Sequence, residues 1–273
     1  MIRVSKLYIF PIKSLGPISV DEIEVEPAGF QGDRRFMLVD QSGTFITQRT
    51  RPDLTRFQLS IHADGFEVLD QISKTKKVLL PNPELLDQVQ VSLWDDQLHV
   101  REVGDEWSAW FSARLQEPVR LVRQLAHRPR LIAEKYQTEG SNQSSLADSL
   151  PVLLASENSY DRLAEVYGKP FDLQRFRANI IVSGAEAFAE DTWDEVSISS
   201  TRLSGAKPCA RCQLVNVKPS TGEVEKGGLL KALASFRQKD NKVYFGQQMV
   251  PIQLGKIRVG DELTVINWKD ALF

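Results

Sequence analysis

The chain has 273 residues, which is enough for one large domain or two modest ones, each with a hydrophobic core. Apolar residues make up 42% and charged residues 26%, and the net charge is -2 with a pI near 6.0, so nothing favours nucleic acid or anionic lipid as a partner. The apolar run at residues 7–12 contains Pro11 and is too short for a secretory leader or a membrane span, so we expect a cytoplasmic protein.

Most of the first hundred residues are predicted to form short strands. Residues 4–12 and 18–26 alternate apolar and polar side chains, as half-buried strands do. Three later stretches join two β-rich runs through a short polar turn, which indicates hairpins. These are residues 36–48, 57–69 and 89–103. Strands and turns at this spacing favour a sandwich or a barrel-like sheet.

Helices enter the pattern after residue 104. Residues 105–115 place Trp107, Trp110, Phe111 and Leu115 near helical spacing, and residues 128–145 form a polar stretch that we expect to be a long loop. Two more helices are predicted at residues 157–168 and 229–238, the first ending at Gly168. The remaining β-rich runs are predicted strands, at residues 121–122, 179–184, 194–199, 202–205, 212–224 and 256–266.

The chain is therefore predicted to be mainly β (α+β). We expect a β-barrel-like module over residues 1–125 and a second β-barrel with a few helices over residues 126–273.

The two cysteines, Cys209 and Cys212, form a lone Cys-x-x-Cys motif. Two thiols cannot hold an all-cysteine iron–sulfur cluster, which needs four. The motif is compatible with half of a zinc site, a thioredoxin-like redox pair, two structural thiols or a single thiolate bound to a soft metal. A predicted strand after the motif weakens the thioredoxin interpretation, and the absence of a second ligand pair in the sequence weakens zinc. Lys207 and Arg211 nearby favour a thiolate.

Three basic motifs lie next to predicted strands. Lys13 and Ser14 follow the first strand, Arg35 belongs to a Gly-Asp-Arg-Arg-Phe run, and Arg177 and Asn179 belong to Arg-Phe-Arg-Ala-Asn. Arginine can bind phosphate through two parallel hydrogen bonds, although a single surface arginine is more often paired with a carboxylate. If these motifs converge with the cysteines, they form an anion pocket with a metal at one end.

Other polar runs carry weaker signals. Residues 148–151 are compatible with a polar turn at the rim of a site, residues 190–195 with a solvated turn, and His127 with an exposed histidine. The sequence has no Ser-His-Asp spacing and no Rossmann glycine fingerprint.

The order and spacing of several segments resemble the MOSC-domain family, including its N-terminal β-barrel module. The segments are IFPIKS, GDRRFMLVDQSGTFITQR, RFRANIIVSGAEAFAEDTWDE, KPCARCQLVNVKPSTGE, FGQQ and IRVGDEL, which span nearly the whole chain. The relevant relatives are bacterial YcbX-like proteins and the amidoxime-reducing component of mitochondria. The resemblance implies that residues 1–125 are the MOSC N-terminal module and residues 126–273 the MOSC domain.

The resemblance also implies a molybdenum cofactor of the molybdopterin type. The second cysteine of the family motif binds the metal, which here is Cys212. Residues that match family positions around the cofactor are Lys13, Ser14, Arg35, Arg177, Asn179, Ala210 and Arg211. Two positions depart from the family pattern, because Ala178 replaces a proline and Ala210 replaces a serine.

By resemblance, the expected reaction is reduction of N-hydroxylated compounds such as hydroxylamines, amidoximes and base analogues. The oxygen leaves as water, and the cofactor carries the redox chemistry. The two cysteines cannot form an iron–sulfur cluster, so electrons are expected from a separate flavin reductase or iron–sulfur protein. The alternative is a protein that binds or carries the cofactor or its sulfur without turnover. A zinc or dithiol protein is the third possibility.

Overall fold

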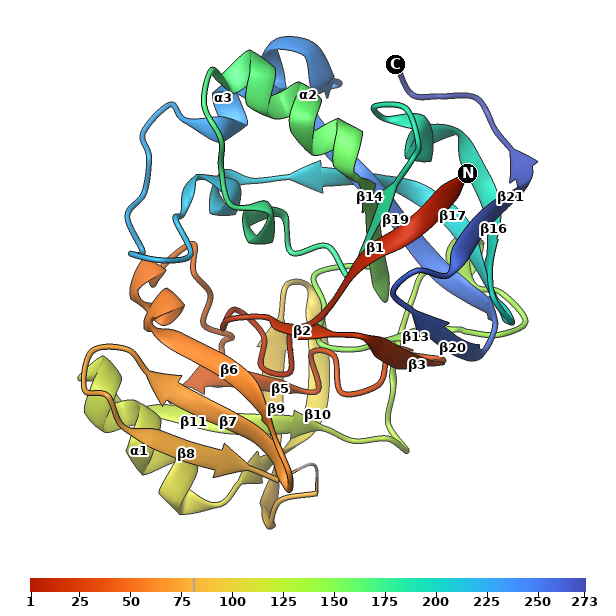
Figure 1. Ribbon diagram of the computed structural model, residues 1–273. Coiled ribbons are helices and arrows are strands. Elements are labelled where there is room, and N and C mark those ends of the chain that lie inside the picture. Colours follow the sequence, from red (N-terminus) through yellow and green to blue (C-terminus); the bar gives the residue numbers. More distant parts are fainter. Residues whose placement is uncertain (81) are drawn as a thin grey trace.

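The computed structural model describes residues 1–80 and 82–273, and its largest sheet closes into a ring of seven strands (Figure 1). In order around the ring, the strands are β14 (Val152–Ser156), β15 (Ile180–Ser183), β1 (Ile2–Ile9), β21 (Glu262–Trp268), β16 (Trp193–Ile198), β17 (Thr201–Arg211) and β19 (Lys242–Gln253). β14 is parallel to β15 and antiparallel to β19, and this second pairing closes the barrel. The mainly β fold with a few helices is confirmed.

The first strand of the chain belongs to this barrel. β1 pairs with β15 and β21, so it fills the gap between two carboxyl-terminal strands, and its Val4 and Leu7 are buried in the largest core cluster. Burial alternates only from Leu7 to Ile9, because the register shifts between Val4 and Lys6, and this shift places both Val4 and Leu7 in the core. The barrel is therefore built from both ends of the chain.

Short strands extend or flank the barrel. β18 (Gln238–Lys239) pairs with β19, and β2 (Ile18–Val20) pairs with β1. A separate small sheet runs β20 (Gly255–Arg258), β3 (Glu22–Glu26) and β4 (Gly29–Phe30). Most of the predicted loop at residues 128–145 is irregular, with β12 (Arg130–Leu131) paired to β13 (Gln143–Ser144).

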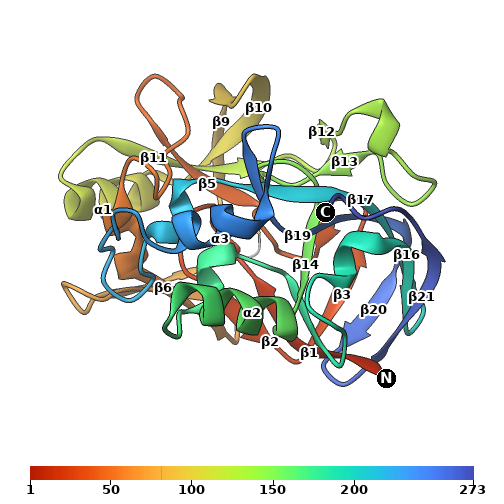
Figure 2. The same cartoon turned by 90° about the horizontal axis from the view of Figure 1, so that it is seen from above.

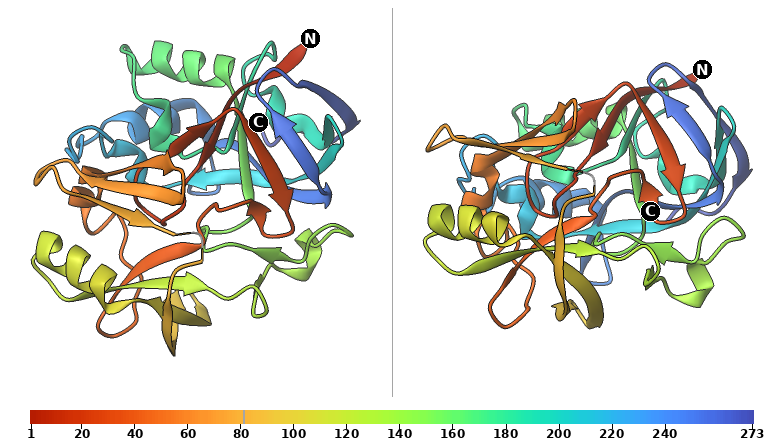
Figure 3. Two further views of the ribbon diagram at one scale, coloured as in Figure 1. Left: turned by 60° about the horizontal axis from the view of Figure 1, so that its bottom comes forward. Right: turned by 90° about the horizontal axis from the view of Figure 1, so that it is seen from below.

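The other amino-terminal strands form two sheets around an aromatic helix (Figure 3). One sheet runs β5 (Phe36–Asp40), β11 (Val119–Gln124), β10 (Asp96–Val103) and β9 (Leu85–Leu93), and the other runs β6 (Phe57–His62), β7 (Gly65–Asp70) and β8 (Lys76–Leu79). The helix is α1 (Asp105–Leu115), as predicted. Its Phe111 ring lies 5.1 Å from that of Phe57 in an edge-to-face contact, which fixes the helix against β6.

Two further helices cover one side of the barrel, α2 (Glu157–Tyr167) and α3 (Leu229–Arg237) (Figure 2). The Ser156 hydroxyl accepts a hydrogen bond from Ser159 N at the start of α2, and Gly168 ends the helix at a φ of 79°. Both ends follow from local sequence, so this helix was predictable. No helix within the described residues is long and apolar enough to cross a membrane.

The predicted strand at residues 212–224 is wrong. The structure has a short 3-10 turn, η5 (Gln213–Asn216), followed by a single bridge between Val217 and Val224. Val215 packs with Leu229 and Leu233 in the second core cluster, so its apolar side chain anchors a turn under α3 rather than a strand. The boundary near residue 125 stays a prediction.

Candidate functional site

The cysteine motif lies at the end of β17, beside β19. Ala210 and Arg211 pair with Tyr244 and Val243, and the chain leaves the sheet immediately afterwards. This placement separates the two thiols, since Cys209 is buried and Cys212 is exposed. The strand predicted after Cys212 is absent, so it does not count against a thioredoxin-like redox pair.

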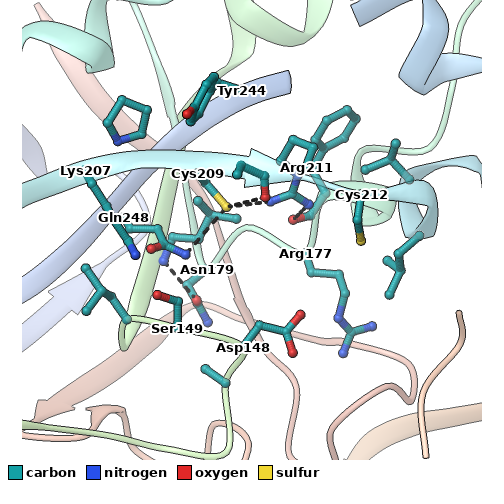
Figure 4. Close-up of a pocket in the computed structure, with 18 of the residues that line it drawn as sticks. Asp148, Ser149, Arg177, Asn179, Lys207, Cys209, Arg211, Cys212, Tyr244 and Gln248 are labelled. Carbon is teal, nitrogen blue, oxygen red and sulfur yellow. Dashed lines mark hydrogen bonds between the residues drawn. The ribbon is translucent and has the colours of Figure 1, made fainter. Parts of the chain in front are cut away.

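Cys212 opens onto a pocket of about 480 Å³ that lies between the barrel and loops of the amino-terminal half (Figure 4). Its polar lining residues include Lys13, Ser14, Arg34, Arg49, Asp148, Ser149, Arg177, Asn179, Lys207, Cys209, Arg211, Cys212, Tyr244 and Gln248. Lys242 also lines the pocket, so seven lining side chains are lysine or arginine and one is a carboxylate, which makes the pocket strongly cationic. A pocket of this kind favours an anionic ligand.

Two arginines of the pocket pack on the same aromatic ring. The guanidinium carbon of Arg34 lies 4.5 Å from the centroid of the Phe10 ring, and that of Arg177 lies 4.2 Å from it. Burial lowers the pKa of Arg177 to about 9, and the charge of Arg34 lowers it further. The two cations are therefore held close together by packing, although their charges repel.

Asn179 and backbone carbonyls hold these arginines in place. Arg34 donates from Nη1 to Asp33 Oδ2 at 2.5 Å and to Asn179 Oδ1 at 3.2 Å. Arg34 Nη2 donates to the Arg177 carbonyl at 3.1 Å, and Arg177 Nη1 donates to the Leu15 carbonyl at 3.0 Å. Asn179 thus has a positioning role, and it also accepts from Leu153 N at 3.2 Å.

Lys13 and Asp148 form an ion pair at the wall of the pocket. The Lys13 ammonium donates to Asp148 and, at 2.9 Å, to the Leu146 carbonyl. Burial lowers the pKa of Lys13 to about 8, although the neighbouring carboxylate opposes this. Burial also raises the pKa of Asp148, but Lys13 outweighs it and holds that pKa well below its usual range. The Lys13 ammonium is therefore expected to lose its proton at a pH close to neutral.

Asp148 is also tied to a hairpin of the amino-terminal half. The Trp94 indole N–H donates to Asp148 at 3.3 Å, and the Arg49 guanidinium lies 4.1 Å from the Trp94 ring centroid. Arg49 Nη1 lies 3.8 Å from Cys212 Sγ, so this arginine links the hairpin to the exposed thiol. The β9–β10 hairpin thus positions groups at the pocket mouth.

Several polar atoms in the pocket wall are buried without a partner among the described residues. They are Arg177 Nη2, Arg211 Nε and Gln248 Oε1. An unsatisfied buried donor costs about 1–3 kcal/mol. A bound polar ligand would supply acceptors for the two guanidinium groups, and this fits an anionic cofactor.

The surroundings of Cys209 differ from those of Cys212. Arg211 Nη1 lies 3.0 Å from Cys209 Sγ and Gln248 Nε2 lies 3.6 Å from it, so two donors point at the buried sulfur (Figure 4). Arg211 also donates to the Phe176 carbonyl at 2.7 Å. This network fixes the end of β17 beside the pocket. Among the described residues, no group of three or more His, Cys, Asp or Glu side chains is placed to hold a metal ion, so the zinc interpretation finds no ligand set there.

The structure brings together all but one of the sequence-predicted site residues. Those that line the pocket are Lys13, Ser14, Arg177, Asn179, Ala210, Arg211 and Cys212. Arg35 lies elsewhere and donates to Glu26 at 2.8 Å, while its neighbour Arg34 lines the pocket. Arg34 has a φ of 49°, and this left-handed turn reverses which arginine points to the pocket. We therefore replace Arg35 by Arg34 in the predicted set.

Arg34, Arg49 and Asp148 were missed as members of the site. Arg34 and Arg49 both lie in a segment that carries the family resemblance, and Asp148 begins the polar turn at residues 148–151, so weak signals were present. Of the acidic run at residues 190–195, Glu190 and Asp191 are buried away from the pocket, and Asp191 pairs with Arg237.

Comparison with protein families matches two domain models. Residues 1–118 match the MOSC N-terminal beta barrel domain, and residues 141–264 match the MOSC domain. Among curated proteins, the chain is 31% identical to mitochondrial amidoxime-reducing component 1 of Xenopus laevis, covering 97% of this chain and 82% of that protein. The human protein of the same name is also 31% identical, with 97% of this chain and 83% of that protein covered. Molybdenum cofactor sulfurase of Danio rerio is 30% identical over 89% of this chain and 31% of its own length.

These relatives correct the expected location. Several of them are named as mitochondrial components, which points to the mitochondrion rather than the cytoplasm. The cytoplasmic prediction rested on the shortness of an apolar run. Mitochondrial targeting segments are amphipathic and rich in arginine, so that criterion does not detect them.

Proposed function

The chain belongs to the MOSC-domain family with the MOSC N-terminal barrel, and on that premise we propose that it is a molybdenum-cofactor-dependent reductase of N-hydroxylated compounds. Its relatives include amidoxime-reducing components and a molybdenum cofactor sulfurase, so a function related to the molybdenum cofactor is shared across them.

One observation carries the proposal. An exposed thiol, Cys212, opens onto a pocket lined by seven cationic side chains and a single carboxylate. A molybdopterin-type cofactor has a phosphate and an anionic dithiolene, so it needs several cationic donors and one protein ligand for the metal. Thiolate sulfur suits such a metal.

The residues that would hold the cofactor have different chemical roles. Cys212 is the proposed metal ligand. Arg34 and Arg177 would bind the phosphate and pterin oxygens by charge-assisted hydrogen bonds, and Lys13 would face the bound cofactor from the wall of the pocket. Asn179 would keep the arginines in position, and Arg211 would orient the end of β17. Ser14 and Ala210 line the same pocket and would contact the cofactor from its walls.

A molybdenum cofactor would supply two-electron chemistry with oxygen-atom transfer. The overall reduction consumes two electrons and two protons, breaks the N–O bond and releases water. Lys13 holds a proton near neutral pH, and Asp148 accepts a hydrogen bond from it at the pocket wall. We assign this pair the task of delivering a proton toward the leaving oxygen. Arg49 and Trp94 keep Asp148 oriented.

Electrons must come from another protein in this proposal. The sequence has two cysteines, and an all-cysteine iron–sulfur cluster needs four. The proposed donor is a flavin reductase or an iron–sulfur protein.

The second candidate is a carrier of the cofactor or its sulfur without turnover. The similarity to a molybdenum cofactor sulfurase favours this possibility. Both candidates predict cofactor binding at Cys212, so binding alone does not separate them.

Turnover of benzamidoxime separates the two functions. The cofactor-loaded protein is given electrons chemically, and benzamidine formation is measured. A reductase converts the substrate with a rate that depends on protein concentration, and Cys212→Ser abolishes it. Cofactor-loaded protein that never produces benzamidine or the corresponding amine from a hydroxylaminopurine contradicts the reductase and leaves the carrier.

A further inference from the structure

A second cavity of about 980 Å³ lies between the amino-terminal sheets and the small β20–β3–β4 sheet, and it shares no lining residue with the candidate pocket. Its walls are largely apolar and are formed by side chains such as Ile9, Ile23, Phe36, Ile61, Phe66 and Leu125. Ile61, at the tip of the β6–β7 hairpin, is 63% exposed. An apolar wall of this size favours a ligand with a hydrocarbon or aromatic body.

Two arginines lie side by side in this cavity. Arg123 on β11 pairs with Phe36 on β5, and Gln124 N donates to the Arg35 carbonyl at 2.9 Å. Burial lowers the pKa of Arg123, and the charge of Arg35 lowers it further. The motif that supplies Arg34 to the candidate pocket therefore supplies Arg35 to this second cavity.

Only one of the two guanidinium groups is paired with a carboxylate among the described residues. Arg35 donates to Glu26 at 2.8 Å. Arg123 donates to the Asn82 amide oxygen at 2.9 Å and lies 5.7 Å from the Phe36 ring centroid, but it forms no ion pair within residues 1–80 and 82–273. A partly desolvated cation with a neutral acceptor retains its capacity to bind an anion.

The acidic residues of the lining limit the charge of that anion. Glu22 pairs with Lys256 and Arg258, and Glu26 pairs with Arg35. Once these pairs are counted, one positive charge remains, on Arg123. A second negative charge on a ligand would meet carboxylates without a free cation, which disfavours a dianion.

We propose that this cavity binds an amphipathic monocarboxylate, with its head group at Arg123 and its apolar body along the Ile23 and Phe66 wall. The assignment does not depend on the proposed reductase function, because the two cavities share no lining residue.

The test is a fluorescence titration of the full chain, loaded with its cofactor, with dansyl-labelled undecanoic acid. Unlabelled decanoate, decanol and sebacate then compete with the probe. We expect decanoate to displace the probe at least about tenfold better than the alcohol or the dicarboxylate, because a charge-assisted hydrogen bond is worth about 1.5–3 kcal/mol. Equal displacement by decanoate and decanol would overturn the assignment.

Variants locate the binding. Arg123→Gln is expected to weaken probe binding by about tenfold or more. Ile61→Asp, at a position that is 63% exposed, is expected to weaken it as well. The matched control Arg202→Gln removes a surface arginine paired with Glu195, and it leaves binding unchanged. If Arg49→Gln abolishes binding while Arg123→Gln does not, the probe occupies the candidate pocket and the proposal fails.

Discussion

Single side chains decide which groups meet at the candidate pocket. The cations Lys13, Arg34 and Arg177 come from two regions far apart in sequence, yet Arg34 and Arg177 pack on the same Phe10 ring. Their mutual repulsion lowers the stability of the fold, and a bound anionic ligand would offset this loss.

Asp148 gives the first residue-scale prediction. Asp148→Asn removes the carboxylate that favours the charged form of Lys13, so the pKa of Lys13 falls further below about 8. We expect benzamidoxime turnover to fall about 100-fold, as for loss of a proton-transfer group. The alkaline decline of the pH–rate profile should also move to lower pH, with unchanged molybdenum content. A variant that keeps the wild-type profile would show that Asp148 has no part in proton delivery.

Glu190 gives a prediction about stability. Its carboxyl group is fully buried, and burial raises its pKa although Ser159 and Ser156 N donate to it. A raised acid pKa means that stability is complete below the unfolded pKa of about 4.3 and declines as pH rises through the folded pKa. Glu190→Gln should therefore gain stability relative to the wild type as pH rises. Urea unfolding at several pH values measures this difference, and a pH-independent difference would contradict it.

The side chains of the site differ in how well the sequence predicts them. Lys13, Arg177 and Cys212 sit in motifs that a sequence can show. The choice between Arg34 and Arg35 depends on one left-handed backbone turn, and no pattern of residue types specified it. Asp148 reaches the pocket from an irregular loop. A loop has no regular repeat, so the sequence does not predict the direction of its side chains.

At the scale of elements, the residues of the turns made two of the hairpins predictable from the sequence. Residues 57–69 and 89–103 became β6–β7 and β9–β10, since alternating strands with polar turns fold by near-neighbour pairing. The stretch after Cys212 has the same composition as a strand, but its apolar side chains pack under α3. Tertiary packing outweighed β propensity there.

The tip of the β9–β10 hairpin yields an element-scale prediction. Leu93 pairs with Asp96, so the loop has two residues, and Trp94 takes a left-handed φ of 56° at a position that glycine favours. Trp94→Gly relaxes the turn but removes the contacts with Arg49 and Asp148. The free energy of unfolding should change by no more than about 1 kcal/mol, because the relaxed turn offsets the lost ring contact.

The functional effect of Trp94→Gly should be larger. We expect KM for benzamidoxime to rise several-fold because Arg49 and Asp148 lose their orientation. Steady-state kinetics and thermal unfolding on the same preparation separate the two effects. An unchanged KM together with a large loss of stability would make Trp94 purely structural.

At the scale of the whole molecule, the barrel and the pocket both combine distant parts of the chain. β1 lies between β15 and β21, and the pocket draws Lys13 and Arg49 from one half and Cys212 from the other. Convergence over such separations could not be read from any sequence window. The family resemblance indicated instead that these distant residues come together.

Barrel closure predicts how a fragment behaves. Residues 126–273 alone lack β1, so β15 and β21 lose their shared partner and the Leu7 side chain leaves the core. We expect this fragment to show no cooperative unfolding by circular dichroism, whereas the full chain does. A fragment that unfolds cooperatively would show that β1 is dispensable for the barrel.

The central claim is that Cys212 holds the metal, and molybdenum content tests it most directly. Wild type, Cys212→Ser and the matched control Cys209→Ser are produced in a host that makes the cofactor, and each is analysed for molybdenum and zinc. The account predicts about one molybdenum per chain in the wild type and in Cys209→Ser, from a single ligating thiolate, and a loss of molybdenum in Cys212→Ser. Unchanged molybdenum in Cys212→Ser, or zinc in its place in the wild type, would contradict it.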